Sequence, residues 1–111
     1  MDEYSQKYLL DVKNACEEVE SFFKGKKNFA NFQTDILRQR AVERNVEIMG
    51  EAINQLLKHD STIVLPNAKA IIGTRNRVIH AYDNVTPEFL WSLVINHIPK
   101  LLEDVQQLLE S

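Results

Sequence analysis

The chain has 111 residues, and its thirteen basic and sixteen acidic side chains give a formal net charge of −3. This length predicts a single domain over residues 1–111, and a hydrophobic share of 44% excludes an intrinsically disordered chain. One cysteine excludes an intrachain disulfide and a zinc site built from several cysteines, and it favours a reducing, cytoplasmic compartment.

Residues 3–24 predict an amphipathic helix, because apolar side chains recur there at spacings of three and four. The stripe consists of Leu9, Val12, Cys16, Val19 and Phe23. Gly25 is placed to end this helix. Cys16 lies on the stripe, so we expect it to belong to the core and not to act as a reactive thiol.

Residues 34–59 predict a second helix with two apolar stripes, which lie roughly 100° apart around its axis. One stripe is Val42, Val46, Met49, Ile53 and Leu56, and the other is Leu37, Ala41, Ile48 and Ala52. An apolar face this wide favours a central helix, or one shared between the core and a partner subunit. Gly50 costs the helix about 1 kcal/mol relative to Ala, and close approach by a neighbour would explain it. His59, in the last turn, is expected to cap the helix.

Two further helical regions complete the chain. Asn67 is placed to cap a helix over residues 68–82, which a turn at Asp83-Asn84 follows. Thr86-Pro87-Glu88 combines a cap, a first-position proline and an acid in the first turn, so it predicts another helix start. Pro99 should kink or split that helix, and Trp91 and His97 are interpreted as structural. The expected fold is an all-α bundle of four or five helices.

The candidate chemistry lies in one basic segment of an otherwise acidic chain. Residues 66–82 contain Lys69, Arg75 and Arg77 and no acid. A pI near 5.6 argues against a general nucleic-acid coat protein, but it leaves open both a small basic pocket and a plain solvated helix face. On a regular helix, Asn76 and His80 lie about 40° apart, whereas Arg75 and His80 lie about 140° and about 7.5 Å apart.

These residue types suit cleavage of a phosphodiester without a metal. Arginine offers a planar, permanently charged fork for phosphate oxygens. Histidine can take the proton of an RNA 2′-hydroxyl or give one to the leaving oxygen. The sequence shows no carboxylate cluster and no histidine pair at metal spacing, so we expect no metal site and no cofactor.

Several segments resemble one known family. The run Arg75–His80 resembles the R-x4-H motif of the HEPN superfamily, and His80-Ala81-Tyr82 resembles the H-x-Y ending of its HepT-like branch. Other blocks similar to that family are Arg40–Arg44, Glu47–Ala52, Ile71–Gly73, Phe89–Trp91 and Ile98–Leu101. The chain departs from the family at Ala68, a packing position where members often carry tryptophan.

The resemblance implies a small all-α toxin of a type VII-like toxin–antitoxin pair, acting as a metal-independent endoribonuclease. Two subunits would face their motifs across a shared cleft, and a minimal nucleotidyltransferase antitoxin (MntA-like) would adenylylate the motif tyrosine, Tyr82. By position, Arg75 would bind the phosphate, His80 would be the acid–base group and Asn76 would orient the imidazole or the phosphate. We add Arg77 and Lys69 as candidate RNA-phosphate ligands, and Glu51 as a supporting residue that pairs with an arginine near the cleft or forms a structural salt bridge.

Two other interpretations stay open. The chain could be a non-catalytic HEPN module that associates with a nucleotidyltransferase, or an inert dimeric scaffold. The complete R-x4-H-x-Y motif favours the catalytic version. We expect no membrane partner, because no apolar run approaches the roughly 20 residues of a membrane span and the charged N-terminal segment does not resemble a signal peptide.

Overall fold

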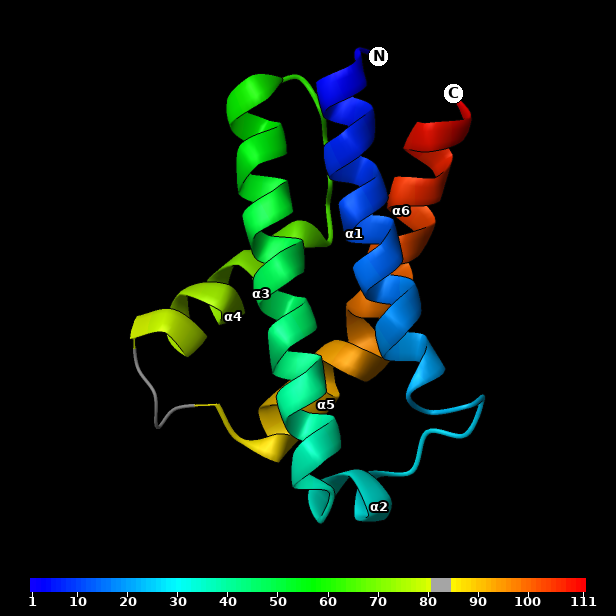
Figure 1. Ribbon diagram of the computed structural model, residues 1–111, viewed down its shortest axis with the longest axis vertical. Coiled ribbons are helices and arrows are strands. Elements are labelled where there is room, and N and C mark those ends of the chain that lie inside the picture. Colours follow the sequence, from blue (N-terminus) through cyan, green and yellow to red (C-terminus); the bar gives the residue numbers. More distant parts are fainter. Residues whose placement is uncertain (81–84) are drawn as a thin grey trace.

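The computed structural model describes residues 1–80 and 85–111, and among these it leaves out the side chains of residues 78–80. The described residues form helices and no strand, which confirms the expected all-α bundle (Figure 1). The helices are α1 (Glu3–Ser21), α2 (Phe29–Gln33), α3 (Ile36–His59), α4 (Ala68–His80), α5 (Pro87–Asn96) and α6 (Ile98–Glu110).

The long helices lie side by side, with α1 packed against both α3 and α6 (Figure 1). The α4 helix packs against α3, and α5 joins α6 to α2 and α3. Both chain termini lie at the same end of the bundle (Figure 1). This arrangement leaves one face of α3 between α1 and α4, where the candidate site is found.

Side-chain caps fix where the helices begin. The carboxylates of Asp2 and Asp35 accept hydrogen bonds from the backbone N–H groups of Ser5 and Arg38, at 2.8 and 3.0 Å. Thr86 caps α5 in the same way, and Pro87 follows at its first position. The predicted start at Thr86-Pro87 is therefore confirmed. The predicted break near Pro99 is also confirmed, since α5 ends at Asn96 and α6 begins at Ile98.

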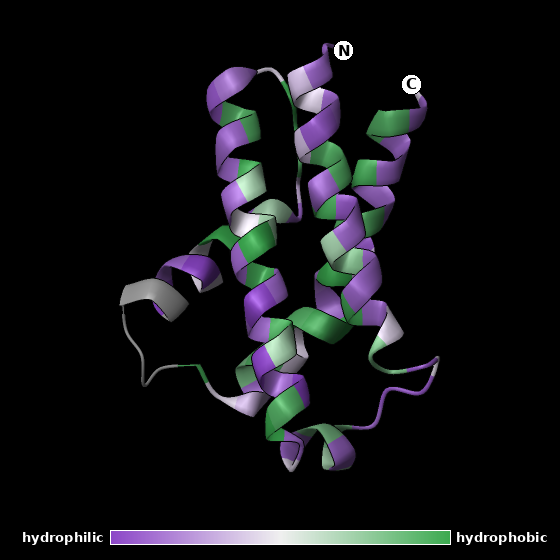
Figure 2. Cartoon of the chain, viewed as in Figure 1, coloured by the Kyte–Doolittle hydropathy of each residue, from purple (hydrophilic) through white to green (hydrophobic). Residues whose placement is uncertain are grey.

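The predicted core stripes are buried. The four stripe residues within α1, Phe23 in the turn after it and all five residues of the first α3 stripe belong to one hydrophobic cluster. Figure 2 shows the alternation of hydrophilic and hydrophobic residues along α1, α3 and α6 that such one-sided burial requires. Cys16 is fully buried, and burial raises the pKa of its thiol to about 12. Its interpretation as a core residue is confirmed.

The second α3 stripe is only partly covered by the chain's own core. Leu37 is 83% exposed and Ile48 is 36% exposed, whereas Ala52 is buried. The α3 helix packs against α1, α2, α4 and α5, so its interpretation as a central helix is confirmed, although its second stripe stays partly exposed. The other interpretation, a face shared with a partner subunit, stays a prediction.

Some element boundaries differ from those predicted. The short α2 was not expected, and α1 ends at Ser21, after which a turn runs to Gly25 with φ 78°. The α3 helix begins at Ile36 and not at residue 34. The α4 helix reaches His80, and the predicted extension to Tyr82 with the turn at Asp83-Asn84 lies outside the described residues.

Two predicted caps make contacts with distant helices. His59 does lie in the last turn of α3, and its Nε2 lies 2.6 Å from a carboxylate oxygen of Asp2, the cap of α1. The backbone N–H of Ser5, followed by the side chain of His59, lowers the pKa of Asp2 to about 2. Asn67 donates from its amide nitrogen to Asp104 on α6 at 2.8 Å. These contacts tie α3 to α1 and the start of α4 to α6.

Trp91 is half-buried in an aromatic cluster, which confirms its structural interpretation. Its ring centre lies 5.7 Å from those of Phe23 and Phe29 and 5.4 Å from that of Phe32. His97 is half-buried at the junction of α5 and α6. None of the described helices has the length and apolar character needed to cross a membrane.

Candidate functional site

The site is built where α4 approaches α3 most closely. A Cβ added to Gly50 would lie 2.7 Å from the Cβ of Arg75, 2.9 Å from its Cγ and 3.0 Å from its Cδ. No side chain fits at residue 50 without movement of α4 or of the arginine. The expected close approach to Gly50 is therefore confirmed, and the neighbour is the arginine of the predicted catalytic motif.

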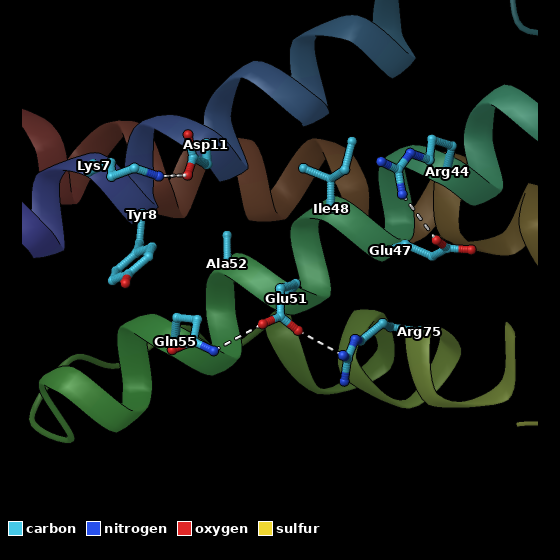
Figure 3. A pocket seen from close by; sticks show the side chains of 10 residues that line it. All are labelled: Lys7, Tyr8, Asp11, Arg44, Glu47, Ile48, Glu51, Ala52, Gln55 and Arg75. Atoms are coloured by element: carbon cyan, nitrogen blue, oxygen red, sulfur yellow. Dashed lines mark hydrogen bonds and ion pairs between the residues drawn. The ribbon is translucent and has the colours of Figure 1, made fainter. Parts of the chain in front are cut away.

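The residue after Gly50 binds the head of the same arginine. The Nη2 of Arg75 donates to Oε2 of Glu51 at 2.7 Å, and Nε2 of Gln55 donates to Oε1 of Glu51 at 2.9 Å. Both carboxylate oxygens are therefore engaged by residues on either side (Figure 3). The expected pairing of Glu51 with an arginine is present, and it holds Arg75 at the guanidinium while Gly50 accommodates the stem.

The guanidinium of Arg75 stays accessible. Its side chain is 23% exposed and that of Glu51 is 51% exposed. Beyond Glu51, Nη1 of Arg75 makes one long hydrogen bond, 3.4 Å, to Oδ1 of the neighbouring Asn76. A guanidinium carries five N–H donors in a planar fork, so these two contacts leave donors with which the same group can bind a phosphate.

Arg75 lines an open pocket of about 410 Å³ between α1, α3 and α4 (Figure 3). The lining residues are Lys7, Tyr8, Asp11, Arg44, Glu47, Ile48, Glu51, Ala52, Gln55 and Arg75.

The charged residues of the pocket form three ion pairs. Lys7 pairs with Asp11 at 2.7 Å and Arg44 with Glu47 at 3.4 Å, in addition to Arg75 with Glu51. The lining therefore carries three cations and three anions. A site with this balance does not attract a polyanion through net charge, so an anionic ligand has to be recognised locally, at individual donors.

The described contacts do not bring all predicted site residues together. His80 is the last residue of α4, about 7.5 Å along the axis and about 140° around it from Arg75 by regular helix geometry. Its side chain and the whole of Tyr82 lie outside the described residues. Asn76 is exposed beside Arg75.

The two other predicted phosphate ligands lie away from the pocket of Arg75. The guanidinium carbon of Arg77 lies 4.2 Å from the ring centre of Phe89, so Arg77 links α4 to α5 through a cation–π contact. Lys69 is exposed and lines a separate pocket of about 330 Å³, together with Pro66, Asn67, Ala70 and His97.

Sequence reasoning missed the α1 side of the pocket. Tyr8 precedes the core residue Leu9, and Lys7 and Asp11 form an ion pair one turn apart, which reads as an ordinary solvated helix face. Their contribution depends on the packing of α1 against α3, which local sequence patterns do not encode. Among the described residues, no group of three His, Cys, Asp or Glu side chains is arranged to hold a metal ion.

Comparison with known proteins assigns the family. The family model described as "Ribonuclease HepT-like" matches residues 12–108. "Putative RNase TTE0752" of Caldanaerobacter subterraneus is 32% identical over 105 residues, which cover 93% of this chain and 92% of that protein. "Probable ribonuclease HepT" of Thermococcus cleftensis is 34% identical over 96 residues, 85% of this chain and 86% of its own. No solved structure matches significantly. The chain therefore belongs to the HepT-like ribonuclease family.

Proposed function

We propose that this chain is a metal-independent endoribonuclease toxin that cleaves RNA with the Arg75–His80 motif. The observation that carries the proposal is the placement of Arg75. Gly50 accommodates its stem, Glu51 holds its guanidinium, and the group opens onto a pocket. A fixed, accessible arginine can stabilise charge that develops on a phosphoryl group. Membership of a ribonuclease family supports RNA as the substrate.

The proposed reaction is an internal transesterification. His80 takes the proton of an RNA 2′-hydroxyl, and the 2′-oxygen attacks the adjacent phosphorus. The bond from phosphorus to the 5′-oxygen breaks, and that oxygen takes a proton from solvent water or from the His80 of a second subunit as it leaves. The products are a 2′,3′-cyclic phosphate and a 5′-hydroxyl. Arg75 stabilises the negative charge on the phosphoryl oxygens, and Asn76 orients the phosphate or the imidazole.

A homodimer would complete the site. Because positions 75 and 80 lie about 140° apart around a regular helix, two motifs facing each other across a cleft could supply both groups to one phosphate. The exposed end of the second α3 stripe, at Leu37, supports a face for a second copy. The cleft between the subunits is then the place of reaction.

The decisive experiment measures cleavage of an RNA oligonucleotide by the purified chain with and without EDTA. His80→Ala should lower the rate by about 10²- to 10⁴-fold, the usual effect of losing an acid–base group. Arg75→Ala should be comparably severe, and circular dichroism should show both variants folded. Cleavage should persist in EDTA and leave a 2′,3′-cyclic phosphate end. Cleavage that EDTA abolishes would contradict the mechanism, and an insoluble His80→Ala would favour a structural role for His80.

Regulation by a nucleotidyltransferase is part of the proposal. The antitoxin would transfer an adenylyl group to Tyr82, two residues after His80 in the sequence. The adduct would add negative charge and bulk near the motif, and it would compete with RNA for Arg75 and Arg77. This part rests on the family resemblance of the H-x-Y ending, and it implies a cytoplasmic protein that meets both its RNA and its antitoxin there.

One observation favours the alternative, a non-catalytic HEPN module associated with a nucleotidyltransferase. Glu51 neutralises Arg75, and every other charge in the pocket is also paired. Expression in a bacterial host separates the two functions. Growth inhibition that His80→Ala relieves supports the ribonuclease, whereas harmless expression of the unaltered chain supports the module.

A further inference from the structure

The pocket beside Arg75 contains more than a phosphate-binding group. Tyr8 lines it from α1, half-buried, while Ile48 and Ala52 contribute apolar surface from α3. In Figure 3 the Tyr8 ring extends from α1 toward α3 on the side of Gln55, and Arg75 lies beyond Glu51. An aromatic and apolar compartment and the arginine therefore line the same pocket, with Glu51 between them.

The size and polarity of this compartment suit one nucleoside. The volume of about 410 Å³ lies within the roughly 300–1,000 Å³ of small-molecule sites. Proteins that recognise single-stranded RNA stack its bases on aromatic rings and bind their edges with polar side chains. Tyr8 offers such a ring. Gln55 offers its amide oxygen, since its nitrogen already donates to Glu51.

The charge balance argues against a polyphosphate ligand. Three cations and three carboxylates line the pocket in pairs, so a nucleoside triphosphate would meet no excess of positive charge. One phosphodiester needs only the remaining donors of Arg75. The lining thus fits a nucleoside with a single phosphate.

We propose that this pocket is a nucleoside-binding subsite, in which Tyr8 stacks against a base of single-stranded RNA whose phosphate binds Arg75. The inference rests on the proposed ribonuclease function for its substrate. It adds the element that receives the base, and it makes Tyr8 a determinant of RNA binding on a helix outside the motif.

Direct binding tests the subsite without cleavage. The four nucleoside 3′-monophosphates and inorganic phosphate are titrated separately into the unaltered chain by calorimetry. At least one nucleotide should bind more tightly than phosphate alone. Tyr8→Leu should weaken that binding by about 5- to 150-fold, the scale of one lost base–aromatic stack. Tyr8→Phe, which keeps the ring, should retain it.

Tyr4→Leu is the matched control. Tyr4 is a second tyrosine on α1, but it is exposed and packs against His59 outside the pocket, with ring centres 5.3 Å apart. It should leave nucleotide binding unchanged. Should Tyr8→Leu fail to fold, the Tyr8 ring protons of the unaltered chain decide the matter by NMR: they should shift on addition of the bound nucleotide.

The outcomes separate this inference from the proposed function. Equal affinity of Tyr8→Leu and the unaltered chain overturns the subsite, and so does an unshifted Tyr8 ring. A Tyr8→Leu chain that binds nucleotide normally but loses its dimeric state overturns it as well, because the pocket is then a contact between subunits. Tyr8-dependent nucleotide binding in a chain that cleaves no RNA keeps the subsite and contradicts the ribonuclease.

Discussion

Gly50 and Arg75 lie in direct contact across the α3–α4 interface, with room for no Cβ between them. The three atoms that a Cβ would meet belong to the arginine stem, and the nearest of them is fixed to the α4 backbone. The absence of one methyl group therefore sets both the depth of α4 on α3 and the position of the guanidinium.

Gly50→Ala should separate stability from activity. Overpacking costs about 1–3 kcal/mol, and better helix propensity offsets about 1 kcal/mol of that loss. The net loss of unfolding free energy should stay below about 2 kcal/mol. RNA cleavage should fall at least about tenfold, because a displacement of about 1 Å can cost 10²-fold. Urea unfolding and initial rates measure the two effects.

Gly73→Ala is the control for Gly50→Ala. Gly73 also lies in a helix, but a Cβ there would meet nothing within 4 Å. This variant should gain about 0.5–1 kcal/mol of stability and keep its cleavage rate. Full activity of Gly50→Ala would show that Arg75 is not positioned by this contact.

Glu51→Gln tests whether the carboxylate positions Arg75 or forms only a structural salt bridge. Ion pairs as exposed as this one contribute about 0–1 kcal/mol, so the unfolding free energy should hardly change. A positioning role predicts a lower kcat, by several-fold or more, with a smaller change in KM. Glu20→Gln, which breaks a comparable pair with Lys27 at 2.9 Å, should change neither constant. An unchanged kcat in Glu51→Gln would show that the pair with Arg75 is only a structural salt bridge.

The proposed homodimer can be checked by light scattering. The chain should be dimeric at micromolar concentration, and a monomer would count against the composite site. Leu37→Glu should weaken the dimer, because it places a charge on the exposed apolar stripe of α3. Val64→Glu is the control, since Val64 is also an exposed aliphatic residue, at 71%, but lies in a loop. A crystal of the dimer with its motifs on opposite outer surfaces would also contradict the proposal.

Adenylylation of Tyr82 predicts a mass increase of one adenylyl group on that residue after co-expression with a partner nucleotidyltransferase. Peptide mass spectrometry locates it, and Tyr82→Phe should prevent it and restore RNA cleavage in the presence of the partner. An unmodified Tyr82 in a fully inhibited complex would show that the partner only masks the site.

The stability of the protein should depend on pH through the carboxyl of Asp2, which caps α1. The pKa of Asp2 falls from 3.8 to about 2 on folding, mainly through the backbone N–H of Ser5 and then His59. A carboxyl with a lowered pKa contributes stability above its ordinary pKa and loses that contribution as pH falls toward the folded value. Asp2→Asn, which keeps a capping oxygen, should therefore lower Tm above about pH 4, with the difference vanishing toward pH 2. A pH-independent difference would contradict this origin.

The sequence predicts the fold wherever local patterns carry the information. The stripe from Leu9 to Phe23 and the start at Thr86-Pro87 depend only on spacing and capping, and both are confirmed. The five-residue α2 was missed because it is too short to show a helical period. His59 was assigned to its own helix end, whereas its partner Asp2 lies 57 positions away.

The sequence likewise predicts only part of the candidate site. The motif identifies Arg75, and Gly50 was expected to meet a close neighbour, but no local pattern says that the two touch. Likewise, Tyr8 enters the pocket only because α1 packs beside α3. These features arise from contacts between residues far apart in the chain, so they require the folded structure.

Trp91, within its aromatic cluster, provides an intrinsic fluorescence probe of folding. Trp91 is the only tryptophan of the chain, and its neighbours come from the α1–α2 connection and from α2 itself. Its emission therefore follows the docking of α2 onto α5, while Arg75 and the pocket contain no indole. A substitution that alters the site but not the tryptophan emission has therefore left the bundle folded. Activity and folding can be followed in the same sample.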